Sequence, residues 1–392
     1  MQDKLFIPHT YLMMIVSLLS VSLANTAYCA ENKAILTVGV GKQFVLPSIA
    51  ATFAKDGDIV EIDANGFYED DTTVWKQNSL TIIGVGGKPK IRSQGSIPNK
   101  KAIWVFRGDN ITVENIEFIN AKVKHHNGAG IRMEGAGLTV RRCTFTDNQN
   151  GILTGRNEES DIVIEHSEFN HNGHGDGLSH NLYIGQVRSL TYRFNYSHHA
   201  FIGHNLKSRA RSNIIYNNSF MDGADGRSSY SIDFSNGGRV IMVGNIIQQG
   251  PGTQNSTIVS YGAEAMKYSD NVFYFVNNTV VNDRHYGVFI KIKEHTKGFI
   301  SNNIFHGKGE FKIYDTEMLN NLLPGKSAHF INIDQYDYRL KPQSKAINAG
   351  IPPPRVSGYS LVPEYEYKHK ADKQTRPRDG QLDLGALEFE AN

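Results

Sequence analysis

Cysteine is almost absent from this chain of 392 residues, which has only Cys29 and Cys143. Long hydrophobic runs are also missing, since the run from Tyr11 to Ala24 has 14 residues and is too short to span a bilayer. Neither charge dominates, because 41 Lys and Arg residues stand against 39 Asp and Glu residues. A net charge of +2 argues against nucleic acid as the main partner.

The run at Tyr11–Ala24 has the length of a signal-peptide core, and Ala27 and Cys29 place small residues where a signal peptidase cleaves. We therefore predict a signal peptide at residues 1–29, no transmembrane anchor, and a periplasmic or secreted mature protein. The alternative is a buried N-terminal strand. Cleavage would leave only Cys143, which excludes a disulfide within the mature chain and predicts a small buried hydrophobe.

A short segment that keeps repeating is the most informative feature that is present. Copies start at Asn110, Leu138, Asp161, Ser189, Ser212 and Arg239. Alignment of the last large apolar residue gives steps of 27, 24, 27, 24 and 27 residues through Phe118, Phe145, Phe169, Tyr196, Phe220 and Ile247. A period in the twenties predicts stacked units that bury one continuous core.

Within each copy the apolar residues alternate, as in Leu138 and Val140, which is strand periodicity. Asparagine recurs beside the bends, where it tolerates the left-handed conformation, at Asn115, Asn217, Asn218, Asn245, Asn277, Asn278, Asn302 and Asn303. We predict an all-β protein, a single-stranded right-handed parallel β-helix with an N-terminal capping helix.

We predict one domain over residues 30–392, with the cap and first coils at 36–107, central coils at 108–307, and C-terminal coils with a closing segment at 308–392. Phe44–Lys55 is the predicted amphipathic capping helix, which would cover an open sheet end. The spacing breaks after Ile247, because Val280 follows 33 residues later, so an insertion is expected near 250–270. Residues 351–375 are expected to wander over the surface and close the other end.

With this period and these bends, the chain resembles the superfamily that includes pectate lyases, chondroitinase B-like lyases, polygalacturonases and mannuronan epimerases. YRLKPQSKAINAG followed by RPRDGQLDLGALE is similar to the closing segment common in secreted members. The resemblance covers almost all of residues 36–390 and implies the β-helix fold and action on carbohydrate. Its catalytic signatures are missing here, apart from Gly173-His174-Gly175, so no catalytic residue is carried over.

Three consecutive coils contain a strand of matching pattern. If Leu182, Leu206 and Ile232 point inward, alternation places Tyr183, Lys207 and Asp233 in one outward column about 10 Å long. The same rule predicts outward columns of Asn181, Asn205 and Ser231, and of Gly185, Arg209 and Ser235. In the following coil, either Ser260 or Tyr261 can face outward. The alternative to a site is a solvated salt bridge between Lys207 and Asp233, which would contribute little.

Histidines crowd the loops that precede these strands, at His166, His171, His174, His180, His198, His199 and His204. His174 with Asp176, and His180, could bind a metal, but zinc would need a third ligand at defined spacing, so we predict no metal site. Calcium stays open as a cofactor, at Asp222 and Asp225 or beside Asp233 and Glu264.

Cleavage of a uronic-acid polymer by β-elimination needs a clamp for the sugar carboxylate, a base and an acid. We predict Arg209 as the clamp, Lys207 as the base, and Tyr183 or His180 as the acid, with Asp233 beside them. The predicted substrate-binding residues are Asn181, His204, Asn205, Ser231, Ser235, Asp176 and Glu264.

The sequence thus predicts an exported, monomeric polysaccharide lyase that acts on an acidic polysaccharide. A glycoside hydrolase using Asp176, Asp233 or Glu264, a C5-epimerase, and a non-catalytic binding protein remain as alternatives. A binder should show aromatic platforms along the solenoid, yet the two tryptophans, Trp75 and Trp104, both precede the column.

Overall fold

The computed structural model describes residues 33–95, 97–356, 358–378 and 380–390, and residues 33–392 form one compact unit. The predicted signal peptide, with Cys29, lies outside the described residues. Among the described residues, no helix combines the length and the apolar character that a membrane crossing requires.

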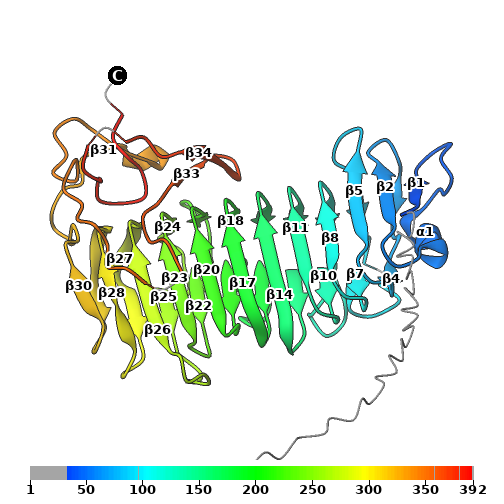
Figure 1. Ribbon diagram of the computed structural model, residues 1–392, viewed down its shortest axis with the longest axis horizontal. Coiled ribbons are helices and arrows are strands. Elements are labelled where there is room, and N and C mark those ends of the chain that lie inside the picture. The colour runs from blue at the N-terminus through cyan, green and yellow to red at the C-terminus, as the bar shows by residue number, and fades with distance from the viewer. Residues whose placement is uncertain (1–32, 96, 357, 379, 391–392) are drawn as a thin grey trace, which may run out of the picture. The chain divides into compact units, whose positions relative to one another are not determined.

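The chain folds as a right-handed parallel β-helix, in which successive coils pair along their strands (Figure 1). One 12-stranded parallel sheet contains β1 (Ile35–Val38), β2 (Ile59–Asp63), β5 (Thr81–Val85), β8 (Ile111–Glu114), β11 (Leu138–Arg141), β14 (Asn157–Glu165), β17 (Val187–Arg193), β20 (Ser212–Tyr216), β23 (Arg239–Val243), β26 (Val272–Val276), β28 (Lys297–Ser301) and β30 (Glu317–Leu319).

An 18-stranded sheet forms the rest of the wall as two ladders, which merge at β27 (Thr279–Ile292) and β29 (Ile304–Lys312). The first ladder contains β3 (Tyr68–Glu69), β6 (Lys90–Arg92), β9 (Glu117–Ile119), β12 (Thr144–Thr146), β15 (Glu168–Asn170), β18 (Tyr196–His198), β21 (Ser219–Met221) and β24 (Ile246–Gln249). The second ladder contains β4 (Thr73–Trp75), β7 (Ala102–Phe106), β10 (Ala129–Met133), β13 (Asn150–Thr154), β16 (Leu182–Ile184), β19 (Leu206–Ser208), β22 (Ile232–Phe234) and β25 (Thr257–Tyr261).

The repeated apolar residues stack inside the coils, as the sequence predicts. Phe118, Phe145 and Phe169 pair in register, and their rings stack with centroids 5.2 and 4.8 Å apart. The expected place of Tyr196 in this column is wrong, because Ser197 pairs with Phe169 and Tyr196 lies on the outer face.

Tyr192 of β17 fills the space that the small Ser197 side chain leaves. Its ring lies 6.1 Å from Phe169 and 5.8 Å from Phe220, so the aromatic column remains continuous. Ile247, Val280 and Phe305 extend the column, which confirms the predicted break in spacing after Ile247. Cys143 is fully buried, and burial raises the pKa of its thiol to about 12.

Asparagine shapes the bend between the 12-stranded sheet and the first ladder. Asn115, Asn217, Asn277 and Asn302 adopt the left-handed conformation, with φ between 51° and 59°. The next residue points inward, and the Asn side chains at this position bond one another from coil to coil. The Oδ1 atoms of Asn218, Asn245, Asn278 and Asn303 each accept the backbone N–H of the preceding coil's Asn, at 2.7 to 3.0 Å.

A second buried polar ladder lies at the corner between the two merged ladders. It runs through Asn148, Asn172, Asn181, Asn205 and Asp222, each bonded to the next. The expectation that Asn181, Asn205 and Ser231 form an outward column is therefore wrong, because all three are fully buried. They directly precede β16, β19 and β22, and the corner turns their side chains inward.

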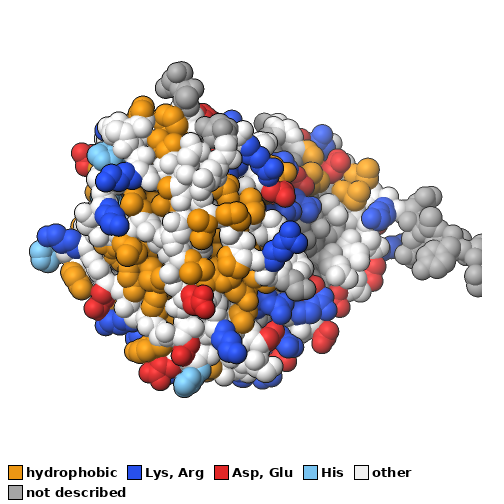
Figure 2. Space-filling view, turned by 60° about the vertical axis from the view of Figure 1, so that its left-hand side comes forward, with side chains coloured by type: hydrophobic (Ala, Val, Ile, Leu, Met, Phe, Trp, Pro, Cys, Tyr) orange, Lys and Arg blue, Asp and Glu red, His pale blue; other side chains and the backbone are white. Residues whose placement is uncertain are grey.

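The ends of the solenoid differ from each other. At the N-terminal end, α1 (Pro47–Phe53) is shorter than predicted and buries Ala50 and Ala51 (Figure 1). At the other end, hydrophobic side chains gather over the middle of the face, with charged ones around them (Figure 2).

The closing segment packs along the side of the coils. It contains β31 (Phe330–Asn332), the short helix η1 (Ile333–Gln335), β32 (Asp337–Leu340), β33 (Tyr365–Lys368) and β34 (Asp372–Thr375). Residues 351–375 were expected to close the C-terminal end of the solenoid. Part of this segment lies along the side instead, because Tyr216 and Asn217, in the middle of the solenoid, donate hydrogen bonds to the carbonyls of Ser360 and Tyr365.

Phe169→Ala should lower the free energy of unfolding by about 3–5 kcal/mol, because it removes a fully buried ring that stacks on Phe145 and contacts Tyr192. Thr191→Ala is the matched control, since Thr191 points outward from β17 and should cost far less. Denaturant titration of both variants checks this, and equal losses would contradict the stacked column.

Asp222→Asn should stabilise the protein at neutral pH. Burial raises the pKa of Asp222 to about 6, against hydrogen bonds from Ser228 and Asn205 that lower it. Because the pKa of Asp222 is higher in the folded state than in the unfolded state, the free energy of unfolding falls by about 3 kcal/mol as pH rises from about 4 to about 6. Unfolding curves should show the variant more stable at pH 7 and equal at pH 4; a difference independent of pH would contradict this.

Candidate functional site

The predicted outward column exists on the second ladder. Tyr183 pairs with Lys207, Lys207 with Asp233, and Asp233 with Ser260. The ambiguity in the fourth coil is resolved, because Ser260 occupies the column and Tyr261 is buried inside. The column continues through Lys291 of β27 and Lys312 of β29, so it is longer than the sequence indicates.

Two carboxylates hold the ammonium group of Lys207. Its Nζ lies 2.7 Å from Oε1 of Glu264 and 3.6 Å from Oδ2 of Asp233. Glu264 reaches this position from the loop after β25, whose backbone N–H at Glu264 donates to the carbonyl of Ser235. Although partial burial acts in the opposite direction, hydrogen bonds from Lys207 and Arg209 lower the pKa of Glu264.

Arg209 lies beside Lys207 and Glu264, and each of its three guanidinium nitrogens makes a polar contact. Nη2 lies 2.6 Å from the other oxygen of Glu264, Nε donates to the Tyr183 hydroxyl at 2.8 Å, and Nη1 donates to Asn236 at 2.8 Å. These contacts fix the plane of the guanidinium, so its geometry is set before any ligand arrives.

Asp233 is a buried support of the cluster, with its side chain 2 % exposed. Burial raises the pKa of its carboxyl group, while the Ser235 hydroxyl and Lys207 act to lower it. The salt bridge between Lys207 and Asp233 considered from the sequence is present, but it is buried and not solvated. Ser235, expected in an outward column, is buried and donates its hydroxyl to Asp233.

Four rings form a row beside the charged cluster. Tyr183 stacks on His180 at 5.7 Å, His180 on His204 at 4.5 Å, and His204 contacts Tyr230 at 5.1 Å. Burial lowers the pKa of both imidazoles, that of His204 to about 3. Nδ1 of His180 accepts the backbone N–H of His204, so this nitrogen has no proton to donate, and the buried ring supports Tyr183.

Asp176 lies outside the cluster. Its carboxylate accepts hydrogen bonds from Leu178 and Ser179 within its own loop and lies 3.6 Å from His126. His174 likewise stacks on His126, and His166 contacts the carbonyl of Ala371.

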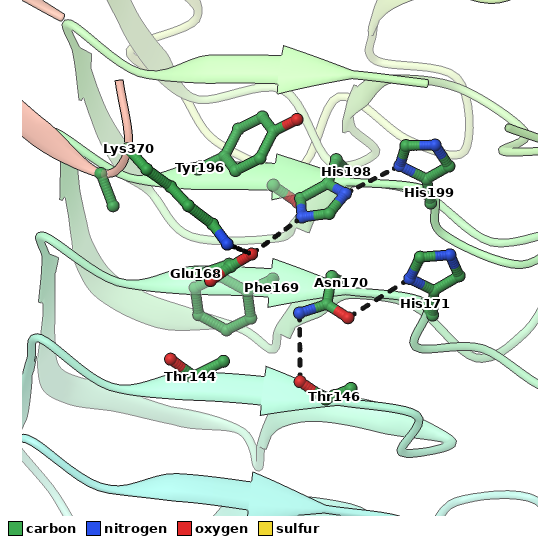
Figure 3. Close-up of polar contacts among 12 residues, drawn as sticks. Thr144, Thr146, Glu168, Phe169, Asn170, His171, Tyr196, His198, His199 and Lys370 are labelled. Carbon is green, nitrogen blue, oxygen red and sulfur yellow. Dashed lines mark hydrogen bonds and ion pairs between the residues drawn. The ribbon is translucent and has the colours of Figure 1, made fainter. Parts of the chain in front are cut away.

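The remaining histidines form a separate group. His171, His198 and His199 lie at the ends of β15 and β18 on the outer face of the first ladder (Figure 3). Only His180 and His204 of the predicted crowd therefore adjoin the column.

A lysine-lined cavity of about 170 Å³ extends the column toward the C-terminal end. Lys291, Lys293 and Lys312 line it together with Ser260 and the exposed ring of Tyr314. Within the described residues, Lys291 and Lys293 make no ion pair. The sequence analysis missed them because it stopped at the ambiguous register of Ser260; following the coil period one step further would have found Lys291.

No group of three or more metal-ligating side chains is present in the part of the chain that the structure describes. Asp222 bonds within the buried ladder, Asp225 contacts His199, and Asp233 and Glu264 pair with cations. These contacts do not fit the calcium sites considered from the sequence.

Neither a protein-family model nor a curated protein sequence matches the chain. Among solved structures, the chain is similar to the crystal structure of pectate lyase Pel9A, with 12% identity, a TM-score of 0.56, and coverage of 91% of this chain and 97% of that one. It also matches ORF18 of Geobacillus virus E2, with 13% identity, a TM-score of 0.45, and coverage of 70% and 55%. At such identities, the similarity to the pectate lyase shows the shared fold.

Proposed function

We propose that the protein is an exported enzyme that cleaves an acidic polysaccharide by β-elimination at the Tyr183–Lys207–Arg209 cluster. The observation that carries the proposal is the juxtaposition of a fixed guanidinium, an ammonium group and a phenol on one face of the solenoid. A lysine-lined cavity continues the same face, and the similarity to a pectate lyase in fold supports a polysaccharide as substrate.

Glu264 occupies the place that a substrate carboxylate would take. Its two oxygens bind Lys207 and Arg209 as a uronate carboxylate would, and its side chain is 45 % exposed. Substrate binding in this proposal exchanges one carboxylate for another, and Glu264 turns toward solvent. The exchange keeps Arg209 paired, so no buried cation is left without a partner.

The three chemical tasks then fall to three side chains. Arg209 neutralises the sugar carboxylate. Lys207, freed from Glu264, releases its ammonium proton to solvent and then, as a neutral amine, takes the proton from the adjacent carbon. A carbon–carbon double bond forms as the glycosidic oxygen leaves. Tyr183 donates its proton to that oxygen, while the Arg209 Nε contact stabilises the developing phenolate.

A hydrolase is the second candidate, because Asp233 and Glu264 lie on either side of the same Lys207 nitrogen, at 3.6 and 2.7 Å. A pair of nearby carboxylates is the arrangement that glycosidases use. The burial of Asp233 disfavours it, since a catalytic carboxylate must reach the sugar or its water.

Incubation of the purified protein with a panel of uronate polymers tests the proposal. Ultraviolet absorbance of unsaturated uronate and reducing ends are measured together. Both should rise. Reducing ends alone would indicate a hydrolase, and neither signal would leave an epimerase or a binding protein.

Lys207→Met and Arg209→Ala should each lower turnover about 100-fold or more, the contribution expected of a base or a charge clamp. Arg209→Ala should impair charged substrates far more than methyl-esterified ones, whereas Lys207→Met should impair both. Melting temperatures serve as the control for folding. Full activity of both folded variants on a cleaved substrate would place the active site elsewhere.

Lys291→Gln together with Lys293→Gln should weaken binding of long anionic oligosaccharides and reduce the salt dependence of the affinity, because two unpaired cations are lost. Short oligosaccharides that reach only Lys207 should bind as before. Lys297→Gln is the matched control, since Lys297 is exposed on β28 of the other sheet. Calorimetric titration at two salt concentrations checks this. Equal effects of the double variant and of Lys297→Gln would contradict binding of the oligosaccharide along Lys291 and Lys293.

A further inference from the structure

A chain of side-chain contacts crosses the outer face of the first ladder, away from the column. Glu168 and Asn170 of β15 lie between Thr144 and Thr146 of one coil and Tyr196 and His198 of the next (Figure 3). Lys370, from the turn between β33 and β34, reaches down to Glu168 (Figure 3). The site proposed above uses none of these residues.

Two carboxylates and two imidazoles follow one another in this chain. Oε1 of Glu168 lies 3.1 Å from Nε2 of His198, and Nδ1 of His198 lies 2.7 Å from Nδ1 of His199. Nε2 of His199 lies 3.2 Å from Oδ1 of Asp225. All four imidazole nitrogens are thus engaged in three contacts.

Each of these contacts needs one hydrogen between its two atoms. Two neutral imidazoles carry one N–H each, so they supply two hydrogens for three contacts. The carboxylates supply none, because hydrogen bonds from His198 and Lys370 outweigh burial to lower the pKa of Glu168, and a hydrogen bond from His199 lowers that of Asp225. We infer that His198 and His199 together form a binding site for one additional proton, which completes the chain from Glu168 to Asp225.

The surroundings balance this charge. With the proton bound, the imidazole pair and Lys370 carry two positive charges against Glu168 and Asp225. Further titratable rings surround the pair among the described residues. Tyr196 stacks on His198 at 4.1 Å and contacts His369 at 5.1 Å, and His171 stacks on His199 at 5.0 Å. Tyr336 faces the loop of Asp225. Burial lowers the pKa of both His198 and His199, so release is expected below the ordinary histidine value of 6.5.

Release of the proton opens one particular contact. The Glu168 side chain is largely buried and held by Lys370, whereas the Asp225 side chain is 87 % exposed. The two remaining hydrogens therefore stay on the Glu168–His198 and His198–His199 contacts. The lone pair of His199 Nε2 then faces the Asp225 carboxylate, which swings into solvent.

The contact that opens joins two loops. His199 begins the loop that leads to His204 and β19, and Asp225 lies in the loop that leads to Tyr230 and β22. The bound proton thus ties these loops together at their outer ends, and its loss loosens them. This inference holds whatever reaction the column performs.

Nitrogen NMR of the full-length protein labelled at histidine tests the inference, with single His→Gln variants for assignment. The Nδ1 signals of His198 and His199 should move together in one step as pH falls. Asp225→Asn should lower the proton affinity of the pair about tenfold, or one pH unit, because the Asn amide donates the missing hydrogen to His199.

Asp372→Asn is the matched control. Asp372 lies 3.4 Å from His166 and takes no part in the contacts that run from Glu168 to Asp225. It should leave the step unchanged. Independent titration of His198 and His199, or equal shifts in both variants, would overturn the shared proton. Amide protection factors, which correct exchange for its base catalysis, should fall in residues 199–204 and 222–230 as pH rises through the step, and protection factors that stay constant would overturn the tie between loops.

Discussion

The in-register parallel pairing of successive coils is the constraint on which the rest of the molecule depends. It places each residue about 4.8 Å above its counterpart one coil earlier, inside and outside alike. Inside the solenoid, side chains of the same type stack on one another, as the rings of Phe118, Phe145 and Phe169 do. The bends would leave backbone groups unpaired, and the inward Asn side chains supply the missing partners from coil to coil.

The same pairing turns distant sequence positions into one surface. Tyr183, Lys207 and Asp233 come from three successive coils and adjoin only because strand pairing holds register across loops of different length. The loop after β25 can therefore carry Glu264 to Arg209 without disturbing the wall. Function in such a solenoid depends on loops and outward positions, while the core sets only their spacing.

Periodicity was enough to predict the fold and the Tyr183–Lys207–Asp233 column. It failed where local geometry departs from alternation. Ser197 takes the inward position because Tyr192 of another strand supplies the ring, which no single-strand pattern reveals. Asn181 and its counterparts lie at a corner, where the chain turns and the alternation of faces stops.

The contact partners of the site residues could be predicted less well than the positions of these residues on the strands. The contact of Glu264 with Lys207 spans 57 residues and depends on an irregular loop, so no period indicates it. The histidines divided between two faces for the same reason, since their loops cross a corner. Sequence spacing determines which strand a residue precedes, but the path of the loop determines which face its side chain joins.

The most direct measurement is a crystal structure of the Lys207→Met variant with a uronate oligosaccharide. The account predicts sugar rings along the column from Tyr183 toward Lys291, one carboxylate on Arg209, and Glu264 displaced toward solvent. An oligosaccharide bound on another face, with Glu264 still paired to Arg209, would contradict it.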